Sequence, residues 1–330
     1  MKSFSLRRGL VPSVVTLALA ATLAACGSDD DDGGDDTEAA TASVDCLTVE
    51  QVVELWKPGS EITNWSQLDD SFPDQEINLF GPGTDSGTYD YMASEIVDPD
   101  AEEPATRDDY EASEDDNVLV DGVAGTEGAT GYFGYTYYEQ NKDRLAAVSI
   151  DSGDGCVAPS AETAQDGTYT PLARPLFIYV NKANYTDNEA VQEYVDFYIN
   201  NLADIAEAGQ FVPLSEELYA ETQSALEELG GSGAEGSSGD VKVDGSSTVY
   251  PMSVLAQEGL AEVNPDVKVT VGEAGTGGGF ELFCAGETDV SDASRPIDEE
   301  EIAACEAEGV EYVELQVATD ALTIVVNPDL

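Results

Sequence analysis

A run of glycine and serine about two thirds of the way along the chain constrains the fold most, because it separates two α/β segments. Residues 230–239 read GGSGAEGSSG, a composition typical of a flexible linker with a reach of ~18 Å. Both segments mix strand-like runs with helical patterns, and no repeat relates them. The clearest strands are expected at 77–80, 176–180, 241–243 and 322–326, and the clearest helices at 190–202 and 216–229. The sequence therefore predicts a mixed α/β protein.

The charge balance excludes several classes of function. The chain has 68 acidic and 12 basic side chains and no histidine, which gives a formal net charge of −56. A nucleic-acid-binding protein needs a basic surface, and catalysis by a Ser-His-Asp or Cys-His arrangement needs histidine. At 42% hydrophobic residues the chain can still bury a core. Because such an acidic surface repels itself unless salt screens it, we interpret the charge as an adaptation to high salt.

The amino terminus predicts export. Lys2, Arg7 and Arg8 precede an apolar run that ends Leu-Ala-Ala-Cys-Gly at 23–27, which resembles the lipobox of bacterial lipoproteins. We expect residues 1–25 to be a signal peptide, Cys26 to carry the lipid, and residues 26–44 to be an acidic tether. The protein would then be anchored to the outer face of the cytoplasmic membrane. An ordinary cleaved signal or an uncleaved anchor is the alternative, and the export route, general or twin-arginine, stays open.

Four further cysteines favour disulfides, because an even number in an exported protein is typical of a disulfide framework. We expect Cys284 to pair with Cys305 and Cys46 with Cys156, although four cysteines permit three pairings and free buried thiols are the alternative. No spacing matches a zinc site, so neither a metal nor a cofactor is expected.

Three loops share one order: a strand, a turn of glycine and hydroxyl residues, then a helix. They are 244–251 (DGSSTVYP), 275–279 (GTGGG) and 81–88 (GPGTDSGT). Helix N-termini present N–H donors and a partial positive charge, and glycine lets an oxyanion approach the backbone. A capping turn looks the same, so one such loop is weak support, but three in one chain favour an oxyanion site. None matches a nucleotide-binding fingerprint.

A fourth segment, 290–297 (VSDASRPI), adds charged candidates. Arg295 is one of four arginines that follow the signal peptide, and it either forms a salt bridge or donates a fork of hydrogen bonds to an anion. Asp292 would repel a bound oxyanion unless that anion carries a proton to donate. Hydrogen phosphate carries one at neutral pH and sulfate does not, so we expect such a site to reject sulfate.

These segments, together with 112–123 and 131–138, closely resemble the substrate-binding protein of the high-affinity phosphate ABC transporter. The resemblance implies a two-lobed periplasmic-binding-protein-like fold of type II, with two mixed-sheet lobes, two crossing strands and phosphate in the cleft. It implies phosphate contacts at Ser86, Gly87, Thr88, Ser247, Thr248, Gly277 and Asp292. We add Val249, Thr276 and Gly278 to the expected ligand set. Some members place an arginine near Pro82, where this chain has none, and we expect Arg295 to replace it.

The order of the segments departs from the family. Family members begin with the part that here follows the linker, so the chain resembles a circular permutant in which 230–239 joins the usual termini. One lobe would combine 173–229 with 240–319, and the other would combine 45–172 with 320–330. A fragment of a tandem array, or an artefact of the gene model, is the alternative, and it predicts an unpaired strand edge near Leu330.

The expected function is binding, not catalysis: capture of inorganic phosphate by a monomer and delivery to the permease subunits. A phosphate sensor or reservoir on the same fold is the nearest alternative. An exported phosphohydrolase is less favoured, because the sequence has neither a dense metal motif nor a G-x-S-x-G nucleophile.

Overall fold

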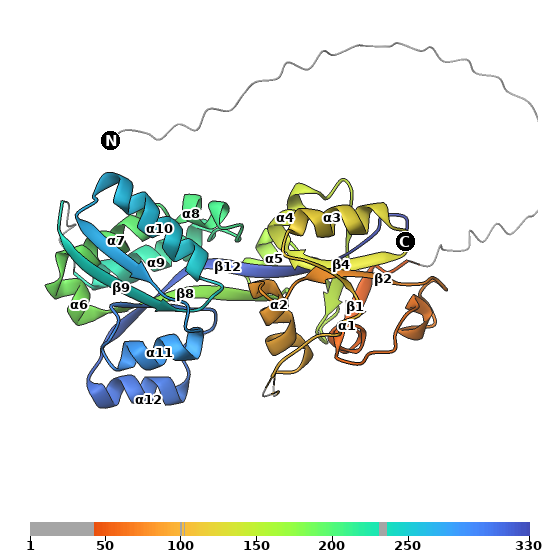
Figure 1. The fold of residues 1–330 in the computed structure, drawn as a ribbon, viewed down its shortest axis with the longest axis horizontal. Coiled ribbons are helices and arrows are strands. Elements are labelled where there is room, and N and C mark those ends of the chain that lie inside the picture. The colour runs from red at the N-terminus through yellow and green to blue at the C-terminus, as the bar shows by residue number, and fades with distance from the viewer. Residues whose placement is uncertain (1–42, 100, 102, 231–235) are drawn as a thin grey trace, which may run out of the picture. The chain divides into compact units, whose positions relative to one another are not determined.

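The computed structural model describes residues 43–99, 101, 103–230 and 236–330. The expected signal peptide, Cys26, nearly all of the acidic tether and residues 231–235 of the linker lie outside these ranges. The described part has an α/β periplasmic-binding-protein-like fold, as the resemblance implied (Figure 1).

A sheet of nine strands runs through the described part of the chain. Eight of them lie in the spatial order β10-β9-β11-β8-β12-β4-β2-β3, and β5 pairs with β12 off this path. The strands are β2 (Asn78–Pro82), β3 (Glu111–Ser113), β4 (Ala129–Gly134), β5 (Ala146–Ala147), β8 (Ala173–Asn181), β9 (Gly239–Gly245), β10 (Val267–Val271), β11 (Val290–Ala293) and β12 (Tyr312–Val326).

Two long antiparallel strands, β8 and β12, lie at the middle of this sheet. Residues 312–321 of β12 pair with β8, and residues 322–326 of the same strand pair with β4. The register of the β8 pairing shifts between Gln316 and Ala318, and β12 changes its partner from β8 to β4 further on, between Ala321 and Leu322. We call the part built on β8–β11 the β9 half and the part built on β1–β7 the β4 half, with β12 shared by both.

The β9 half has helices on both faces of its strands. Leu176, Ile178 and Val180 of β8 pack into one core, while the alternating residues Phe177 and Tyr179 pack into another on the opposite face. Figure 1 shows α7 and α10 on one side and α11 and α12 on the other. The helices are α6 (Lys182–Asp187), α7 (Glu189–Asn200), α8 (Leu202–Ala208), α9 (Glu216–Glu228), α10 (Tyr250–Val263), α11 (Thr276–Cys284) and α12 (Glu299–Glu308).

The β4 half has a core around two tryptophans. Trp56 and Trp65 are fully buried, and Trp56 packs edge-on against Tyr132. A second, three-stranded sheet in the order β1-β6-β7 covers this core. The remaining elements are β1 (Cys46–Thr48), β6 (Ser149–Asp151), β7 (Cys156–Val157), α1 (Val49–Trp56), η1 (Trp65–Gln67), α2 (Gly87–Tyr91), η2 (Met92–Val97), α3 (Asp116–Gly125), α4 (Tyr135–Gln140) and α5 (Ala161–Gln165).

Both expected disulfides are confirmed. Cys46 is bonded to Cys156, which ties β1 to β7, and Cys284 is bonded to Cys305, which ties α11 to α12. Each bond therefore joins elements within a single half.

The strand nearest Leu330 has a strand partner along nearly all of its length: β8 up to Ala321, then β4, with β5 as a second partner at Val325 and Val326. Leu330 itself packs against the core that contains Val44. The permuted order stays a prediction, and the alternative of a fragment stays open beside it.

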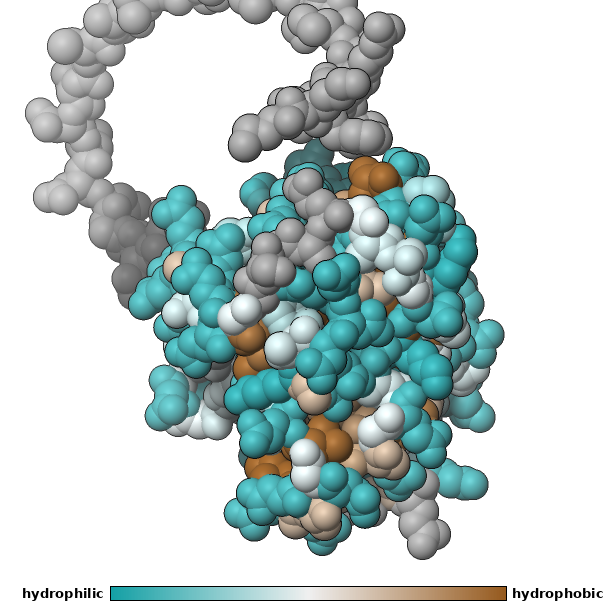
Figure 2. Space-filling model, turned by 90° about the vertical axis from the view of Figure 1, so that its left-hand side faces the viewer, coloured by the Kyte–Doolittle hydropathy of each residue, from teal (hydrophilic) through white to brown (hydrophobic). Residues whose placement is uncertain are grey.

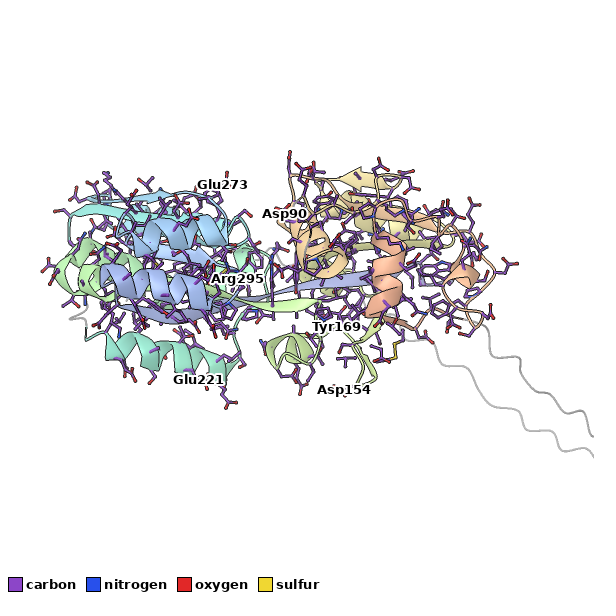
Figure 3. The ribbon with its side chains drawn as sticks, turned by 90° about the horizontal axis from the view of Figure 1, so that it is seen from below. Asp90, Asp154, Tyr169, Glu221, Glu273 and Arg295 are labelled. Atoms are coloured by element: carbon purple, nitrogen blue, oxygen red, sulfur yellow. A yellow bond between two sulfur atoms is a disulfide. The ribbon has the colours of Figure 1, made fainter. Side chains whose placement is uncertain are left out.

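Acidic side chains cover the surface. Figure 3 shows Asp154, Glu221 and Glu273 projecting outward from different elements, and the face in Figure 2 is mostly hydrophilic. Among the described residues, the large hydrophobic side chains that are exposed are Val118 and Val263. None of the helices in the described part of the chain is long and apolar enough to cross a membrane.

Candidate anion-binding site

Three of the predicted segments meet in the β9 half because β10, β9 and β11 are parallel, so the ends of these strands lie at one edge of the sheet. Ser246 N donates to Asp292 O at 2.9 Å, and Gly275 N donates to Gly245 O at 2.9 Å. Ser294 N donates to Thr276 Oγ1 at 3.2 Å. The first, second and fourth predicted segments are therefore hydrogen-bonded to one another.

This meeting requires glycine at two positions. Gly245 has a φ of +141°, and a Cβ atom there would lie 2.1 Å from Asp292 O. A Cβ atom on Gly279 would lie 2.5 Å from the Cα of Gly245. Only glycine lets the end of β9, the first turns of α11 and β11 approach this closely.

The third predicted loop reaches the same place from the β4 half. Ser86 caps α2, since its hydroxyl accepts a hydrogen bond from Thr88 N at 3.2 Å. A Cβ atom added to Gly87 would lie 3.4 Å from Thr248 Oγ1, so the third loop lies against the first.

A small cavity of about 130 Å³ lies between these two loops. It is lined by Gly87, Thr88, Phe211, Ser247, Thr248, Pro251 and Asp320. Four of the predicted ligand residues thus share one cavity. The other predicted residues, Ser86, Val249, Thr276, Gly277, Gly278, Asp292 and Arg295, are not among the residues that line it.

Arg174, at the start of β8, is a site residue that the sequence analysis missed. Its Nη2 atom donates to Thr248 Oγ1 at 2.9 Å, and its Nε atom donates to Asp320 Oδ2 at 3.3 Å. The guanidinium carbon lies 3.9 Å from the centre of the Tyr91 ring, which is cation–π geometry. The available signals were that arginine is scarce here and that Arg174 directly precedes the apolar run of β8.

The pair of Arg174 and Asp320 places one positive and one negative charge beside the cavity. Their side chains are 13% and 12% exposed, so water screens the pair poorly. Burial raises the pKa of Asp320, and the nearby Arg174 opposes that rise. These two bonds use two of the five N–H donors of the guanidinium, and an oxyanion beside Thr248 could accept from the others.

Asp292 is completely buried behind the first loop. Ser253 Oγ donates to its Oδ1 at 2.9 Å, and its Oδ2 has no hydrogen-bond partner among the described residues. Burial raises the pKa of Asp292 to about 8, the Ser253 hydroxyl opposes the rise, and the charge of Asp244 adds to it. The carboxyl group therefore has one oxygen available for a further donor.

The phosphate contact expected of Arg295 stays a prediction, and in this structure its side chain forms a salt bridge. Its two terminal nitrogens donate to both carboxylate oxygens of Glu301, at 2.8 and 2.7 Å. Glu301 is held in place because it forms a capping box with Asp298 at the start of α12. Arg295 thus has the salt-bridge role that the sequence left open, and Arg174 is the arginine that contacts the first loop.

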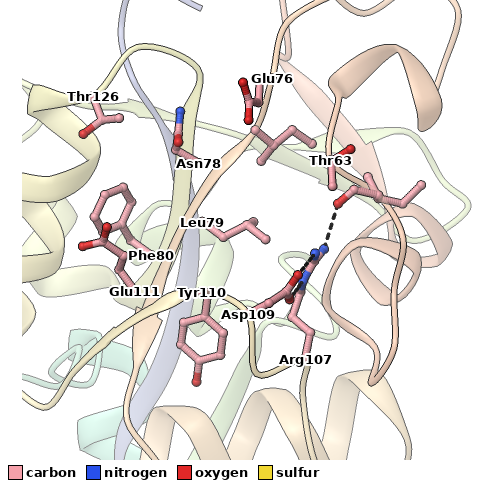
Figure 4. Close-up of a pocket in the computed structure, with 12 residues that line it drawn as sticks. Thr63, Glu76, Asn78, Leu79, Phe80, Arg107, Asp109, Tyr110, Glu111 and Thr126 are labelled. Carbon is pink, nitrogen blue, oxygen red and sulfur yellow. Dashed lines mark hydrogen bonds and ion pairs between the residues drawn. The ribbon is translucent and has the colours of Figure 1, made fainter.

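A larger pocket of about 420 Å³ lies at the edge of β2 and has a different character (Figure 4). Its arginine, Arg107, donates twice to Asp109 and also to the carbonyl oxygens of Leu55 and Ile62. Since these bonds hold the guanidinium within the fold, Arg107 has a structural role.

Two α/β halves that share long strands, with a polar cavity lined by loops from both, define a ligand-binding protein. The chain belongs to the PBP superfamily: the model described as "PBP superfamily domain" matches residues 21–201 and 230–329. The match falls into two parts separated by residues 202–229, which contain α8 and α9.

Two relatives come from sequence comparison. The chain is 46% identical over 175 residues to "Protein SphX" of Synechocystis, covering 52% of this chain and 51% of that protein. It is 35% identical over 189 residues to "Phosphate-binding protein PstS" of Staphylococcus saprophyticus, covering 56% of each. The chain thus spans about half the length of the curated relatives it matches.

Two solved structures share the fold. A phosphate-binding protein of a phosphate ABC transporter from Streptococcus pneumoniae has a TM-score of 0.59 at 20% identity, over 77% of this chain and 89% of that one. A possible phosphate-binding protein from Planctomyces limnophilus has a TM-score of 0.53 at 35% identity, over 58% and 67%.

Proposed function

We propose that the protein captures hydrogen phosphate outside the cytoplasmic membrane and delivers it to an ABC permease. The observation that carries the proposal is the cavity in which Thr248, Gly87 and Thr88 meet beside Arg174. Hydroxyl groups, backbone N–H groups and a guanidinium are the donors that suit phosphate oxygens. The relative PstS and the two solved structures are named as phosphate-binding proteins, which points to the same ligand.

The acidic surface does not argue against an anionic ligand. Charges on the surface are screened within ~3 Å at 1 M salt, whereas these donors act at hydrogen-bond distance. We therefore propose that the net charge of −56 affects how fast phosphate is captured but does not determine which ligand binds.

Asp292 is proposed as the group that accepts a hydrogen bond from the proton of the bound anion. Because burial favours the protonated carboxyl group in the ligand-free protein, we propose that Asp292 releases its own proton to solvent when the anion binds. The Asp292 carbonyl oxygen accepts a hydrogen bond from Ser246 N, next to the cavity residue Ser247. The Oδ2 atom of Asp292 has no hydrogen-bond partner within the part of the chain that the structure describes. Sulfate has no proton to offer to this oxygen and would leave it unpaired, which costs free energy in a buried site.

The same proposal includes the organisation expected from the sequence. The two halves act as lobes around the ligand, the segments are in circularly permuted order, Cys26 carries the lipid anchor, and the protein works as a monomer. Binding, not hydrolysis, is the proposed activity. The pairing of β12 with both β8 and β4 is consistent with a permuted chain.

Titration calorimetry of the intact chain with inorganic phosphate, with sulfate as competitor, tests this function. We expect binding at one site in strong salt that sulfate does not displace. Folded protein that gives no heat with phosphate at either high or low salt would contradict the proposal.

Substitution of arginines makes the test specific to the site. Arg174→Gln should weaken phosphate binding roughly tenfold to a hundredfold, because a charged hydrogen bond contributes about 1.5–3 kcal/mol. Arg144→Gln is the matched control, since Arg144 forms an exposed ion pair with Asp121. Arg295→Gln should also leave the affinity unchanged. Equal losses in all three variants would mean that Arg174 has no special role.

A further inference from the structure

The buried lining residues of the candidate anion cavity, which we call its floor, differ in polarity from those at its solvent-facing side, which we call its rim. Thr248 and Asp320, which line the cavity, are each only 9% exposed, and both are polar. Phe211 and Pro251 are the apolar lining residues, and both are accessible to solvent to some degree. Ser247 is polar and also exposed, so Phe211 and Pro251 form the apolar part of the side where the cavity meets the surface.

Phe211 belongs to a short segment, 210–213, that follows α8 and has an unusual backbone. Gln210 has a φ of +64°, and among the described residues other than glycine it is the one with positive φ. This left-handed conformation is unfavourable for a residue with a side chain. Surrounding contacts must therefore hold Gln210 in place.

Those contacts come from the other half of the protein. Thr136 Oγ1, on α4, donates to Gln210 O at 2.8 Å, and Gln140 Nε2 donates to Gln210 Oε1 at 3.1 Å. On α5, Gln165 Nε2 donates to Pro213 O at 2.6 Å. The segment 210–213 thus belongs to the β9 half but is bonded to two helices of the β4 half.

The segment is also fixed to the shared strand. Val212 and Thr319 exchange two backbone hydrogen bonds, of 3.0 and 2.9 Å, and Thr319 directly precedes Asp320. Val212 is buried together with Tyr135, Ala164 and Ala321. Both neighbours of Phe211 in the chain, Gln210 and Val212, are thus fixed by hydrogen bonds, and Phe211 itself lines the cavity.

We propose that Phe211 is a specificity-determining residue that makes the site accept inorganic phosphate and reject phosphate monoesters, and that Gln210 positions it. The inference rests on the proposed function. A free phosphate can bind entirely among the buried polar groups around Thr248. The organic substituent of a phosphate ester must project toward the solvent-facing side of the cavity, where it would meet the Phe211 ring. The contact from Thr136 keeps the ring there by holding the strained Gln210.

The test compares inorganic phosphate with methyl phosphate by titration calorimetry on the full chain. In Phe211→Ala the affinity for methyl phosphate relative to phosphate should rise roughly tenfold or more, the usual effect of opening space in a tight pocket. Phe197→Ala is the matched control, because Phe197 is a half-buried phenylalanine that packs against the same core away from the cavity. Its relative affinity should equal that of the wild type.

A second pair of variants tests the positioning role. Thr136→Val removes the donor to Gln210 at nearly constant volume and should raise the relative affinity for methyl phosphate in the same direction as Phe211→Ala. Thr222→Val is the control, since Thr222 Oγ1 donates to Gln316 O at 2.9 Å without contacting the segment. Phe211→Leu replaces Phe211→Ala if urea unfolding shows that the alanine variant does not fold.

The outcomes separate the two proposals. If the wild type binds no phosphate, the proposed function fails. If the wild type binds phosphate and the Phe211 variants keep its ratio of affinities, only the role of Phe211 fails. A change of ratio in Phe211→Ala without any change in Thr136→Val would overturn the positioning role of Gln210.

Discussion

Replacing Asp292 with asparagine should alter how the free energy of unfolding depends on pH. Burial raises the pKa of Asp292 from its ordinary value of 3.8 to about 8. The folded protein thus keeps a proton that the unfolded chain releases from about pH 4 upward. The stability that this proton contributes is complete below that pH and is lost as the pH rises toward 8. Within this window one such group changes the free energy of unfolding by about 1.4 kcal/mol per pH unit.

Urea unfolding at pH 5, 6 and 7, at one high salt concentration, measures this effect. Relative to Asp292→Asn, the wild type should lose about 3 kcal/mol of stability between pH 5 and pH 7. Asp143→Asn is the control, because Asp143 is exposed and its surroundings change little on unfolding. If the difference between the wild type and Asp292→Asn does not vary with pH, the carboxyl group is not held in the buried, protonated form described here.

Four further predictions concern binding and stability. Asp292→Asn should reduce the preference for phosphate over sulfate in competition calorimetry, and an unchanged preference would exclude its role as hydrogen-bond acceptor for the proton of the bound anion. Arg174→Lys should recover only part of the affinity lost in Arg174→Gln, because lysine lacks the planar fork; full recovery would mean that charge alone matters. Replacing Cys284 and Cys305 together by alanine should lower the free energy of unfolding by about 3 kcal/mol, since the bond closes a loop of modest length. Stopped-flow measurements should find slower phosphate capture in dilute buffer than in strong salt, and the opposite trend would contradict our interpretation of the charge.

Local patterns predicted the local features well. The central residues of the strands β2, β8 and β9 coincide with the apolar runs in which we expected strands. The helix α9 (Glu216–Glu228) almost matches the expected helix 216–229. The helix expected at 190–202 ends as α7 at Asn200, and a new helix, α8, begins at Leu202. These elements could be found because their apolar residues recur at the period of a helix or strand.

The length of β12 could not be predicted in the same way. Only 322–326 reads as an apolar strand, whereas the structure continues the strand back to Tyr312. Its earlier part includes Glu314, Gln316 and Asp320, whose polar groups find partners on neighbouring elements: Glu314 accepts a bond from Tyr179, and Asp320 accepts one from Arg174. Such partners are set by tertiary contacts and leave no pattern along the chain.

The same reason explains why the sequence did not settle the roles of two arginines. Arg295 lies six residues from Glu301, and the sequence alone gave both an ion pair and an anion contact as possible roles. Arg174 lies 74 residues from Thr248, its hydrogen-bond partner, and only the arrangement of β8 beside β12 brings it to the cavity. Sequence motifs identified the loops of the site, but which arginine lies beside those loops depends on how distant strands pair.

The strand β12 has a consequence for cooperativity. Leu315 and Val317 lie in the core of the β9 half, whereas Leu322 and Ile324 lie in that of the β4 half. If one core unfolds and releases its part of β12, the part of the strand that lies in the other core loses its support as well. The two halves should therefore melt in one calorimetric transition, and amide hydrogens on both parts of β12 should exchange with the same, slowest, rate.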